Sequence, residues 1–219
     1  MASKGLVSQG AYIEVSREQS IAGVTISASA KTLTRADGSF IDDGFEVGQR
    51  LETDALGNPG PLVITKVEAT VLTVTGTVTD AASGTVHFIR FIRVRELINF
   101  GTPAGEPGEI EMTNLDSEAE EFRNSLRDEG SISGSMNFVP ADAGQKVLAA
   151  MSHELTPSVV IITLPPYVGN RLSLDGYEWR FEALGRGMVG EIATKSRVTR
   201  ALNLRISGAV AETIIPAGV

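Results

Sequence analysis

The 219-residue chain contains no cysteine. This absence excludes a disulfide framework, thiolate zinc sites, iron–sulfur clusters and cysteine nucleophiles. Basic residues are in deficit, with 19 lysines and arginines against 27 aspartates and glutamates, and the net charge of −8 argues against binding to a nucleic-acid backbone. Aromatic residues make up only 5% of the chain and are not interleaved with basic ones, which argues against stacking on single-stranded bases.

Long hydrophobic runs are also missing. No apolar segment approaches the roughly 20 residues of a membrane-spanning helix, and the N-terminal residues lack the apolar core of an export signal. We therefore expect a soluble protein, made in a cytoplasm, with no membrane partner. A chain of this length can bury about 70% of its unfolded surface, so it needs no cross-link to fold.

β-branched residues are abundant, with 20 valines, 18 threonines and 16 isoleucines, and the 23 glycines suit many turns. These residue types favour pleated strands over helices. The sequence therefore predicts an all-β fold, β-rich with one or two short helices.

Residues 25–91 have the pattern of a separate unit. Turn signals such as Asp42-Asp43-Gly44 and the Ala-Ala-Ser-Gly stretch at 81–84 separate short strand-like stretches. These stretches are residues 26–34, 50–53, 62–67, 71–74 and 85–91. We predict that residues 25–91 form a small β-barrel module inserted into a discontinuous main domain, which comprises residues 1–24 and 92–219.

Residues 101–130 hold most of the net charge, with nine acidic and two basic side chains. A Gly/Pro loop precedes a strand over 109–113, and the S-x-x-E pattern at 117–120 is typical of a helix N-terminus. Phe122 and Leu126 follow at i, i+4, which predicts a short helix with one apolar face. This acidic segment is either a solvated surface, or one that repels a polyanion or pairs with a basic neighbour.

The remainder of the chain alternates strands with one helix. Residues 131–138 alternate strictly, and residues 140–155 predict a helix that begins near Pro140. Its inward side chains are expected to be Val147, Leu148, Met151 and Leu155. A strand over 159–164 and two long alternating strands near the C-terminus complete the pattern, which indicates a β-sandwich or half-barrel.

Several patterns with catalytic or binding precedents have simpler explanations. The G-x-G-x-x-G at 185–190 follows a strand, but a strand-like segment follows it instead of a crossover helix, so a hairpin or bulge is the better interpretation. The two histidines, His87 and His153, lack zinc-site spacing, although a Ser-His-Asp triad stays open because its members converge only in space.

Two sets of acidic residues also have a functional and a simpler explanation. Glu109 and Glu111 lie roughly 6.5–7 Å apart on one strand face, a spacing that suits glycoside hydrolysis, yet an exposed acidic edge is commoner. Three aspartates at 37, 42 and 43 could meet a calcium ion, but their spacing is not that of an EF-hand and turn chemistry accounts for them.

Residues 101–145 resemble a known family. GTPAGEPGEIEMTNLDS at 101–117 is similar to the loop, strand and "T-x-L-D-S" signature of major tail tube proteins of long-tailed bacteriophages. AEEFRNSLRDEG at 119–130, the strand 131–138 and PADAGQ at 140–145 resemble the next segments of that family. Residues 37–48 and 64–76 resemble a small β module common in phage tail proteins.

The resemblance implies a structural subunit and no catalysed reaction, metal or cofactor. Hexameric rings would stack into a tube with a continuous β-barrel wall in the virion. That tube would surround the tape measure protein, contact tail terminator and tail-tip or baseplate proteins, and conduct viral DNA.

The length, charge and resemblance of residues 101–130 predict an inter-ring stacking loop and helix. Its expected residues are Gly101, Glu106, Glu109, Asp116, Ser117, Glu120, Phe122 and Arg127. The expected lumen face is Glu109, Glu111, Ser133 and Ser135. Two alternatives stay open: another ring-forming tail or secretion-tube component, such as a tail terminator, and a carbohydrate-binding or hydrolytic β-sandwich.

Overall fold

The computed structural model describes residues 10–55, 60–113, 119–169, 172–187, 190–191 and 197–217. The protein is all-β, with a single short helix among the described residues, as the sequence predicts. It divides into two compact units, Glu14–Arg93 and Met1–Ile13 with Val94–Val219. We call them the barrel unit and the sheet unit. The first boundary lies at Ile13, inside a continuous strand, and not near residue 24.

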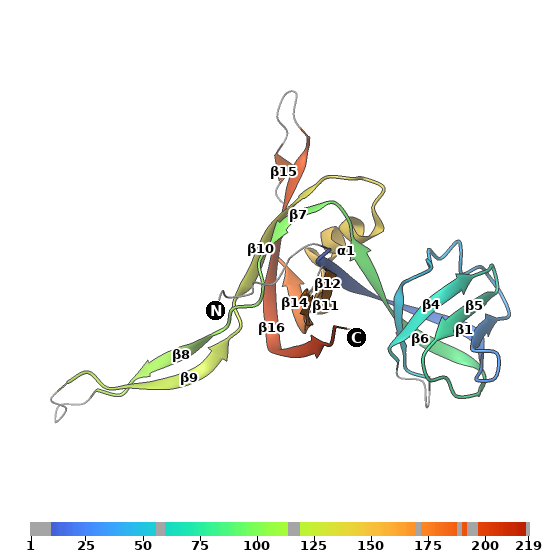
Figure 1. Ribbon diagram of the computed structural model, residues 1–219, viewed down its shortest axis with the longest axis horizontal. Helices are drawn as coiled ribbons and strands as arrows, with labels where there is room; N and C mark the ends of the chain where they lie inside the picture. The colour runs from blue at the N-terminus through green and yellow to red at the C-terminus, as the bar shows by residue number, and fades with distance from the viewer. Residues whose placement is uncertain are drawn as a thin grey trace. The chain divides into compact units, whose positions relative to one another are not determined.

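The barrel unit is a small sheet whose strands pair in a closed ring (Figure 1). The pairing order is β2-β5-β4-β3-β6-β1, and β1 pairs with β2 to complete the ring. The strands are β1 (Tyr12–Ser27), β2 (Thr32–Arg35), β3 (Arg50–Thr53), β4 (Leu62–Val67), β5 (Val71–Thr75) and β6 (Ala81–Val94). Closure removes the exposed strand edges that would otherwise attract other chains.

Two local expectations for this unit are wrong. Residues 26–34 do not form one strand, because β1 ends at Ser27 and Lys31 turns the chain with a positive φ of 51° before β2. The glycine-containing stretch at 81–84, expected as a turn, begins the long strand β6. The predicted bounds of β3 and β4 are confirmed.

An aromatic cluster occupies the core of the barrel unit. The rings of Phe40, Phe45 and Phe88 meet edge-to-face, with centroids 5.1, 5.8 and 6.5 Å apart. The buried Arg90 guanidinium lies 4.2 Å from the Phe45 centroid and donates a hydrogen bond of 3.0 Å to the Asp43 carbonyl. Burial lowers the pKa of Arg90 to about 10, so this arginine is charged at neutral pH.

The sheet unit contains one large antiparallel arrangement in the order β11-β14-β16-β10-β7. These strands are β7 (Leu97–Phe100), β10 (Ser131–Asn137), β11 (Ser158–Leu164), β14 (Gly176–Gly185) and β16 (Thr199–Ile215). Three short strands accompany them: β12 (Tyr167–Gly169) pairs with β13 (Leu172–Leu174), and β15 (Gly190–Glu191) pairs with β16. Strand β10 shows the predicted alternation, since Ile132 and Met136 are buried while Ser131 and Ser133 are exposed.

Helix α1 (Ala143–Met151) covers part of this sheet. The Asp142 carboxylate caps it by accepting a 2.8 Å hydrogen bond from the Gln145 N–H, which satisfies a helix-end donor. Val147, Leu148 and Met151 are buried as predicted. The helix ends at Met151, so the expectation of an inward Leu155 is wrong: this side chain is 96% exposed.

No helix in the described residues has the length and apolar character needed to cross a bilayer.

Strand β14 approaches the end of α1 closely: a Cβ at Gly185 would lie 2.8 Å from the Ser152 nitrogen. The glycine at this position therefore lets the helix pack directly on the sheet.

Candidate assembly surface

The described part of residues 101–130 forms a two-stranded hairpin between β7 and β10, and we call this segment the hairpin arm (Figure 1). Its strands, β8 (Glu106–Glu111) and β9 (Phe122–Asp128), pair antiparallel with each other. The helix predicted from the 117–120 capping pattern and from Phe122 and Leu126 is therefore wrong, because this segment is strand β9. Pairing with β8, more than ten residues earlier in the chain, overrides the local helical signal.

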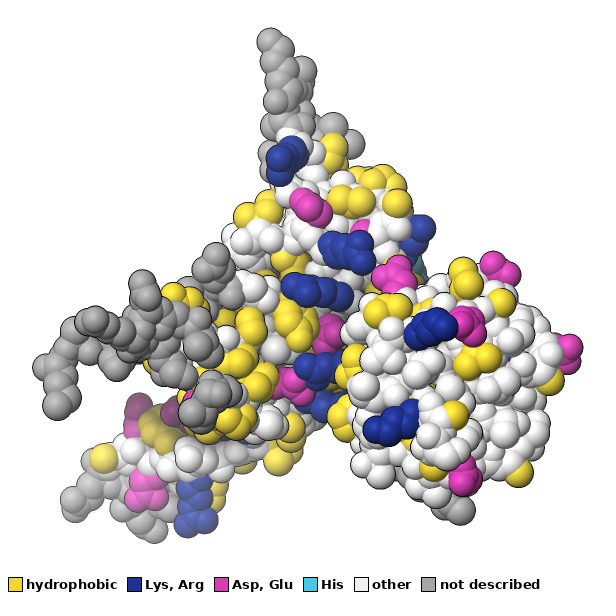
Figure 2. All heavy atoms as spheres, turned by 45° about the vertical axis from the view of Figure 1, so that its right-hand side comes forward, with side chains coloured by type: hydrophobic (Ala, Val, Ile, Leu, Met, Phe, Trp, Pro, Cys, Tyr) yellow, Lys and Arg dark blue, Asp and Glu magenta, His cyan; other side chains and the backbone are white. Residues whose placement is uncertain are grey.

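The hairpin arm exposes an unusual number of large apolar side chains. Ile110, Met112, Phe122 and Leu126 are 50%, 45%, 54% and 91% exposed. Neither arm strand has a substantial interface with the other described strands of the sheet unit from β7 onward. Figure 2 shows hydrophobic and acidic side chains mixed on this projection, at the lower left. Because an isolated two-stranded hairpin is marginally stable in water, such a surface is typical of a segment that docks against a partner.

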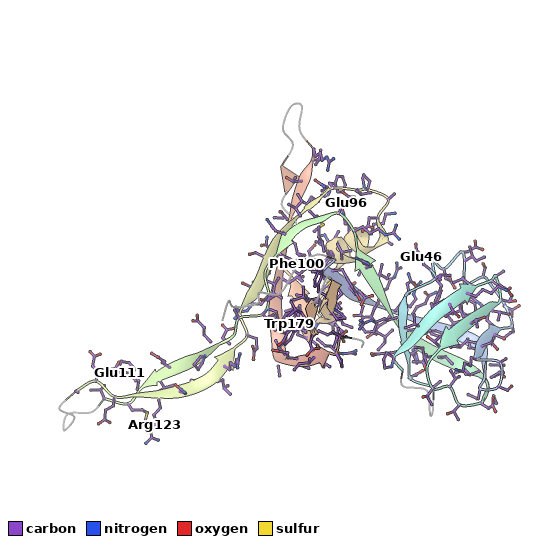
Figure 3. All side chains as sticks on the ribbon, in the orientation of Figure 1. Glu46, Glu96, Phe100, Glu111, Arg123 and Trp179 are labelled. Atoms are coloured by element: carbon purple, nitrogen blue, oxygen red, sulfur yellow. The ribbon has the colours of Figure 1, made fainter. Side chains whose placement is uncertain are left out.

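The strand register assigns the arm side chains to two faces. Glu109 pairs with Asn124 and Glu111 with Phe122, and directly paired residues share a face. We call this the acidic face. Ile110, which pairs with Arg123, lies on the opposite face. Figure 3 shows Glu111 and Arg123 toward the far end of the arm.

Ion pairs neutralise the base of the arm but not its far end. Asp128 bonds Arg205 at 2.7 Å, and Glu129 bonds Arg127 at 3.1 Å. The Gly130 N–H and, to a lesser extent, Arg205 hold the pKa of Asp128 below its usual value. By contrast, the carboxylates of Glu109 and Glu111 have no ion-pair partner among the described residues.

The structure places most of the predicted stacking residues on this arm. Gly101 lies at its base, where its N–H donates a 2.9 Å hydrogen bond to the Ser133 carbonyl. Glu106 and Glu109 are in β8, Glu120 precedes β9, and Phe122 and Arg127 are in β9. Asp116 and Ser117 lie outside the described residues.

The predicted lumen residues divide between two sheets. Glu109 and Glu111 belong to the hairpin arm, whereas Ser133 and Ser135 belong to β10 in the main sheet. Ser133 is exposed, and the Ser135 hydroxyl lies 3.0 Å from the Asn99 carboxamide oxygen of β7. The four residues therefore do not form one continuous strand face.

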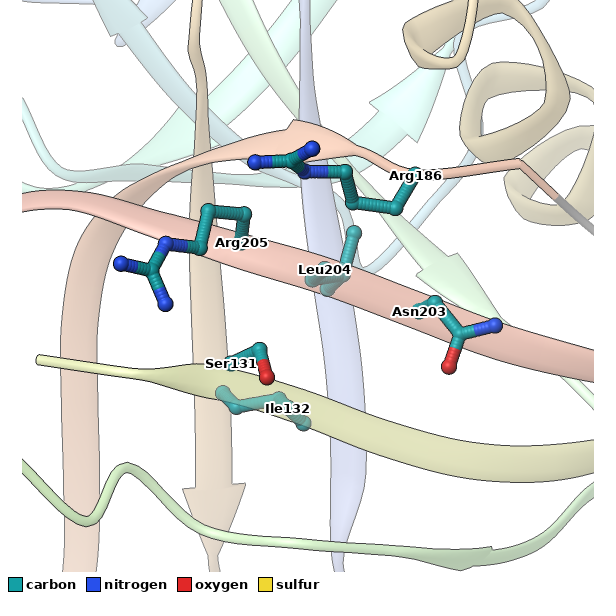
Figure 4. A pocket seen from close by; sticks show the side chains of 6 residues that line it. All are labelled: Ser131, Ile132, Arg186, Asn203, Leu204 and Arg205. Atoms are coloured by element: carbon teal, nitrogen blue, oxygen red, sulfur yellow. The ribbon is translucent and has the colours of Figure 1, made fainter.

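A groove with two arginines lies on the polar face of the main sheet, next to the base of the arm. Ser131 pairs with Arg205, Ser133 with Asn203, and the Arg186 N–H donates to the Asn203 carbonyl. The groove has a volume of about 380 Å³ and is lined by Ser131, Ile132, Arg186, Asn203, Leu204 and Arg205. In Figure 4 the Arg186 and Arg205 side chains extend toward the same end of this groove. Sequence reasoning missed it, because its residues come from three separate segments.

The barrel unit brings together a serine, a histidine and an aspartate that the sequence did not connect. The Ser20 Oγ lies 2.5 Å from the His87 Nδ1, and the Asp54 Oδ2 lies 3.7 Å from the His87 Nε2. A pocket of about 410 Å³ adjoins them. The Asp54 Oδ2 is too far from the imidazole ring for a hydrogen bond, and the Asp54 Oδ1 accepts a hydrogen bond from the His87 backbone N–H. The side chains of His87 and Asp54 are both more than half exposed. The arrangement therefore lacks the buried, oriented base that nucleophilic catalysis needs.

The other sequence patterns have structural roles. The G-x-G-x-x-G spans the end of β14 and the start of β15, and β15 pairs antiparallel with β16, so the described part contains no strand–turn–helix there. Asp43 forms an ion pair with Arg35, and the described residues hold no cluster that could bind a metal ion.

No known protein-family model matches the chain, and comparison with curated proteins finds no match. The assignment of a function therefore depends on the geometry of the hairpin arm and the main sheet.

Proposed function

We propose that this protein is the subunit of a phage tail tube, in which hexameric rings stack through the hairpin arm. The observation that carries the proposal is the arm itself. It is a self-paired hairpin that leaves Ile110, Met112, Phe122 and Leu126 in water, within the segment that resembles the tail tube family.

A second copy of the chain is the partner that best suits this arm. The arm carries nine acidic and two basic residues, whereas the rest of the sheet unit carries ten basic and eight acidic residues. Contact between one copy's arm and another copy's sheet unit therefore brings opposite charges together. Such a head-to-tail contact does not pair identical surfaces, so it propagates into a filament when it joins one ring to the next and no rotation closes it.

The edge of the main sheet supports contacts within a ring. Strand β7 is the last strand in the order, and Ile98 in this strand is 55% exposed. An edge strand offers unpaired backbone groups to a neighbouring chain, so pairing between subunits would extend the sheet around a ring.

In the proposed tube, Ser133 and Ser135 on the polar sheet face, with Glu109 and Glu111, line the lumen. Acidic and hydroxyl side chains would let DNA pass without adhering, because like charges oppose phosphate contact. The tape measure protein would occupy the same lumen before ejection, and terminator and tail-tip or baseplate proteins would close the two ends. The chain acts in the virion and catalyses no reaction.

Assembly of the purified protein at rising concentration tests this proposal. We expect light scattering to show a mass far above 23.2 kDa and negative-stain electron microscopy to show rings and stacked tubes. The triple variant Ile110→Ser, Phe122→Ser, Leu126→Ser should fold normally, because its targets are exposed, but should give single rings or monomers.

Leu155→Ser is the matched control, since this side chain is 96% exposed on the sheet unit but outside the arm. It should assemble like the unmodified chain. A wild-type protein that stays monomeric up to its solubility limit would refute the proposed function. Tubes of normal length from the triple variant would refute the role of the arm.

A further inference from the structure

We infer that the groove between Arg186 and Arg205 of one copy receives the acidic face of the hairpin arm of a second copy. This inference rests on the proposed function and names the receiving surface for the arm. Glu109 and Glu111 supply the carboxylates, and Arg186 supplies the principal guanidinium.

The two arginines of the groove differ in what they already bind. Arg205 forms an ion pair of 2.7 Å with Asp128 of its own chain. Arg186 is exposed, and its side chain has no carboxylate partner among the described residues. Arg186 is therefore available for a forked contact with an incoming carboxylate, and the Ser131 hydroxyl and Asn203 amide provide further donors in the same groove.

The acidic face of the arm has the matching pattern. Glu109 and Glu111 are two residues apart on one strand face, roughly 6.5–7 Å by strand rise, and Phe122 lies directly opposite Glu111. The arm therefore presents two carboxylates on one face, and these are the groups that the guanidinium of Arg186 can bind.

The arm cannot bring these carboxylates to its own groove. Asn124, the pairing partner of Glu109, lies in β9, and the end of this strand at Asp128 is already held beside the groove by the ion pair with Arg205, so Glu109 and Glu111 lie farther out along the arm. Figure 1 shows the arm directed away from β10 and β16. The carboxylates of Glu109 and Glu111 and the guanidinium of Arg186, which have no ion-pair partner among the described residues, can therefore meet between copies.

A nucleic acid is a poorer occupant than a second copy. A phosphate backbone approaching the groove would also approach the adjacent arm, whose net charge is −7. A second copy's arm carries the same charge, but it also brings exposed apolar side chains that a nucleic-acid backbone lacks. Because Ser133 pairs with Asn203, which lines the groove, docking of the arm would bring Glu109 and Glu111 to the polar face that carries Ser133, and the candidate lumen residues would then come from two copies.

Charge reversal in the full-length protein tests the pairing. We expect Arg186→Glu to raise the concentration needed for tube formation by about tenfold or more, because it places like charges in contact. Adding Glu109→Lys and Glu111→Lys to that variant should restore assembly, since every copy then carries a basic arm and an acidic groove. Lys146→Glu, on the exposed side of α1, is the control with the same change in net charge and should assemble normally.

Each outcome has a separate meaning in sedimentation and electron microscopy. Normal tubes from Arg186→Glu would overturn the groove as the receiving surface while leaving the proposed function intact. Failure of the combined variant to recover would overturn Glu109 and Glu111 as the occupants. Binding of a DNA oligonucleotide that is abolished by Arg186→Glu would assign the groove to phosphate instead. Absence of tubes from the wild-type chain would refute the proposed function, and the inference would fall with it.

Discussion

Gly134 controls how closely β7 approaches β10 at the base of the hairpin arm. A Cβ at this position would lie 2.5 Å from the Asn99 carbonyl oxygen and 3.0 Å from the Phe100 Cα. Both are backbone atoms, so relief requires the two strands to separate. Gly134→Ala therefore overpacks this site, and the usual penalty for such a change is about 2 kcal/mol.

Gly101→Ala is the matched control on the neighbouring strand segment. Its nearest contact would be the Ser133 carbonyl oxygen at 3.7 Å, an ordinary van der Waals distance, and Gly101 does not have a positive φ. This substitution should leave stability unchanged or raise it by about 0.5 kcal/mol, because alanine restricts the unfolded chain more than glycine does.

The single tryptophan makes the measurement specific to one unit. Trp179 lies in β14 and stacks on Tyr177 with centroids 5.8 Å apart, so its fluorescence reports on the sheet unit. With a urea dependence of roughly 2 kcal/mol per molar, Gly134→Ala should lower the unfolding midpoint by about 1 M.

Local separation of β7 gives a second readout. The Gly101 N–H bonds the Ser133 carbonyl across these strands, and a loss of about 2 kcal/mol would accelerate its hydrogen exchange by about 30-fold. If Gly134→Ala changes neither the midpoint nor the exchange rate, the steric reasoning is refuted.

Two further predictions concern the barrel core and the base of the arm. Phe88→Ala removes a fully buried ring that contacts Phe40 and Phe45, so we expect a loss of about 3–5 kcal/mol in the barrel unit, measured by calorimetry. The barrel unit has no tryptophan or tyrosine, so we expect the Trp179 transition to shift less, and an equal shift would show that the two units unfold together. Arg205→Gln should raise the pKa of Asp128 only part of the way to its usual value, because the Gly130 N–H remains. Because folding lowers this pKa, the contacts of the Asp128 carboxylate stabilise the fold at pH values above the usual carboxyl pKa. That stabilisation is lost as the pH falls through the lowered pKa. An unchanged pKa in a carboxyl NMR titration would contradict the role of Arg205.

The sequence predicted the strand and helix faces correctly in elements that bury one face against the core of the same unit. The alternation of β10 and the buried stripe of α1 were predictable because Ile132, Met136 and Leu148 face the core. The end of α1 was not, since Leu155 continues the helical period for one turn beyond Met151 but makes no buried contact.

The local sequence pattern predicted a helix in the hairpin arm, and this prediction was wrong for a physical reason. Phe122 and Leu126 have helical spacing, but both are exposed, so no buried face enforces either period. Strand formation there depends on pairing with β8, a non-local contact that local propensity does not report. The same limit applies to the arginine groove, whose residues Ser131, Arg186 and Arg205 converge only after β10, β14 and β16 align.

The connectivity of the barrel unit has a consequence for how such a chain can diversify. The barrel unit begins on β1 and ends on β6, and these two strands are neighbours in its sheet. Adjacent strands lie only about 4.8 Å apart, so the two connections to the sheet unit lie side by side. A module attached in this way can be removed or exchanged when a short turn joins the two strand ends, because the chain then re-enters the sheet unit at the same place.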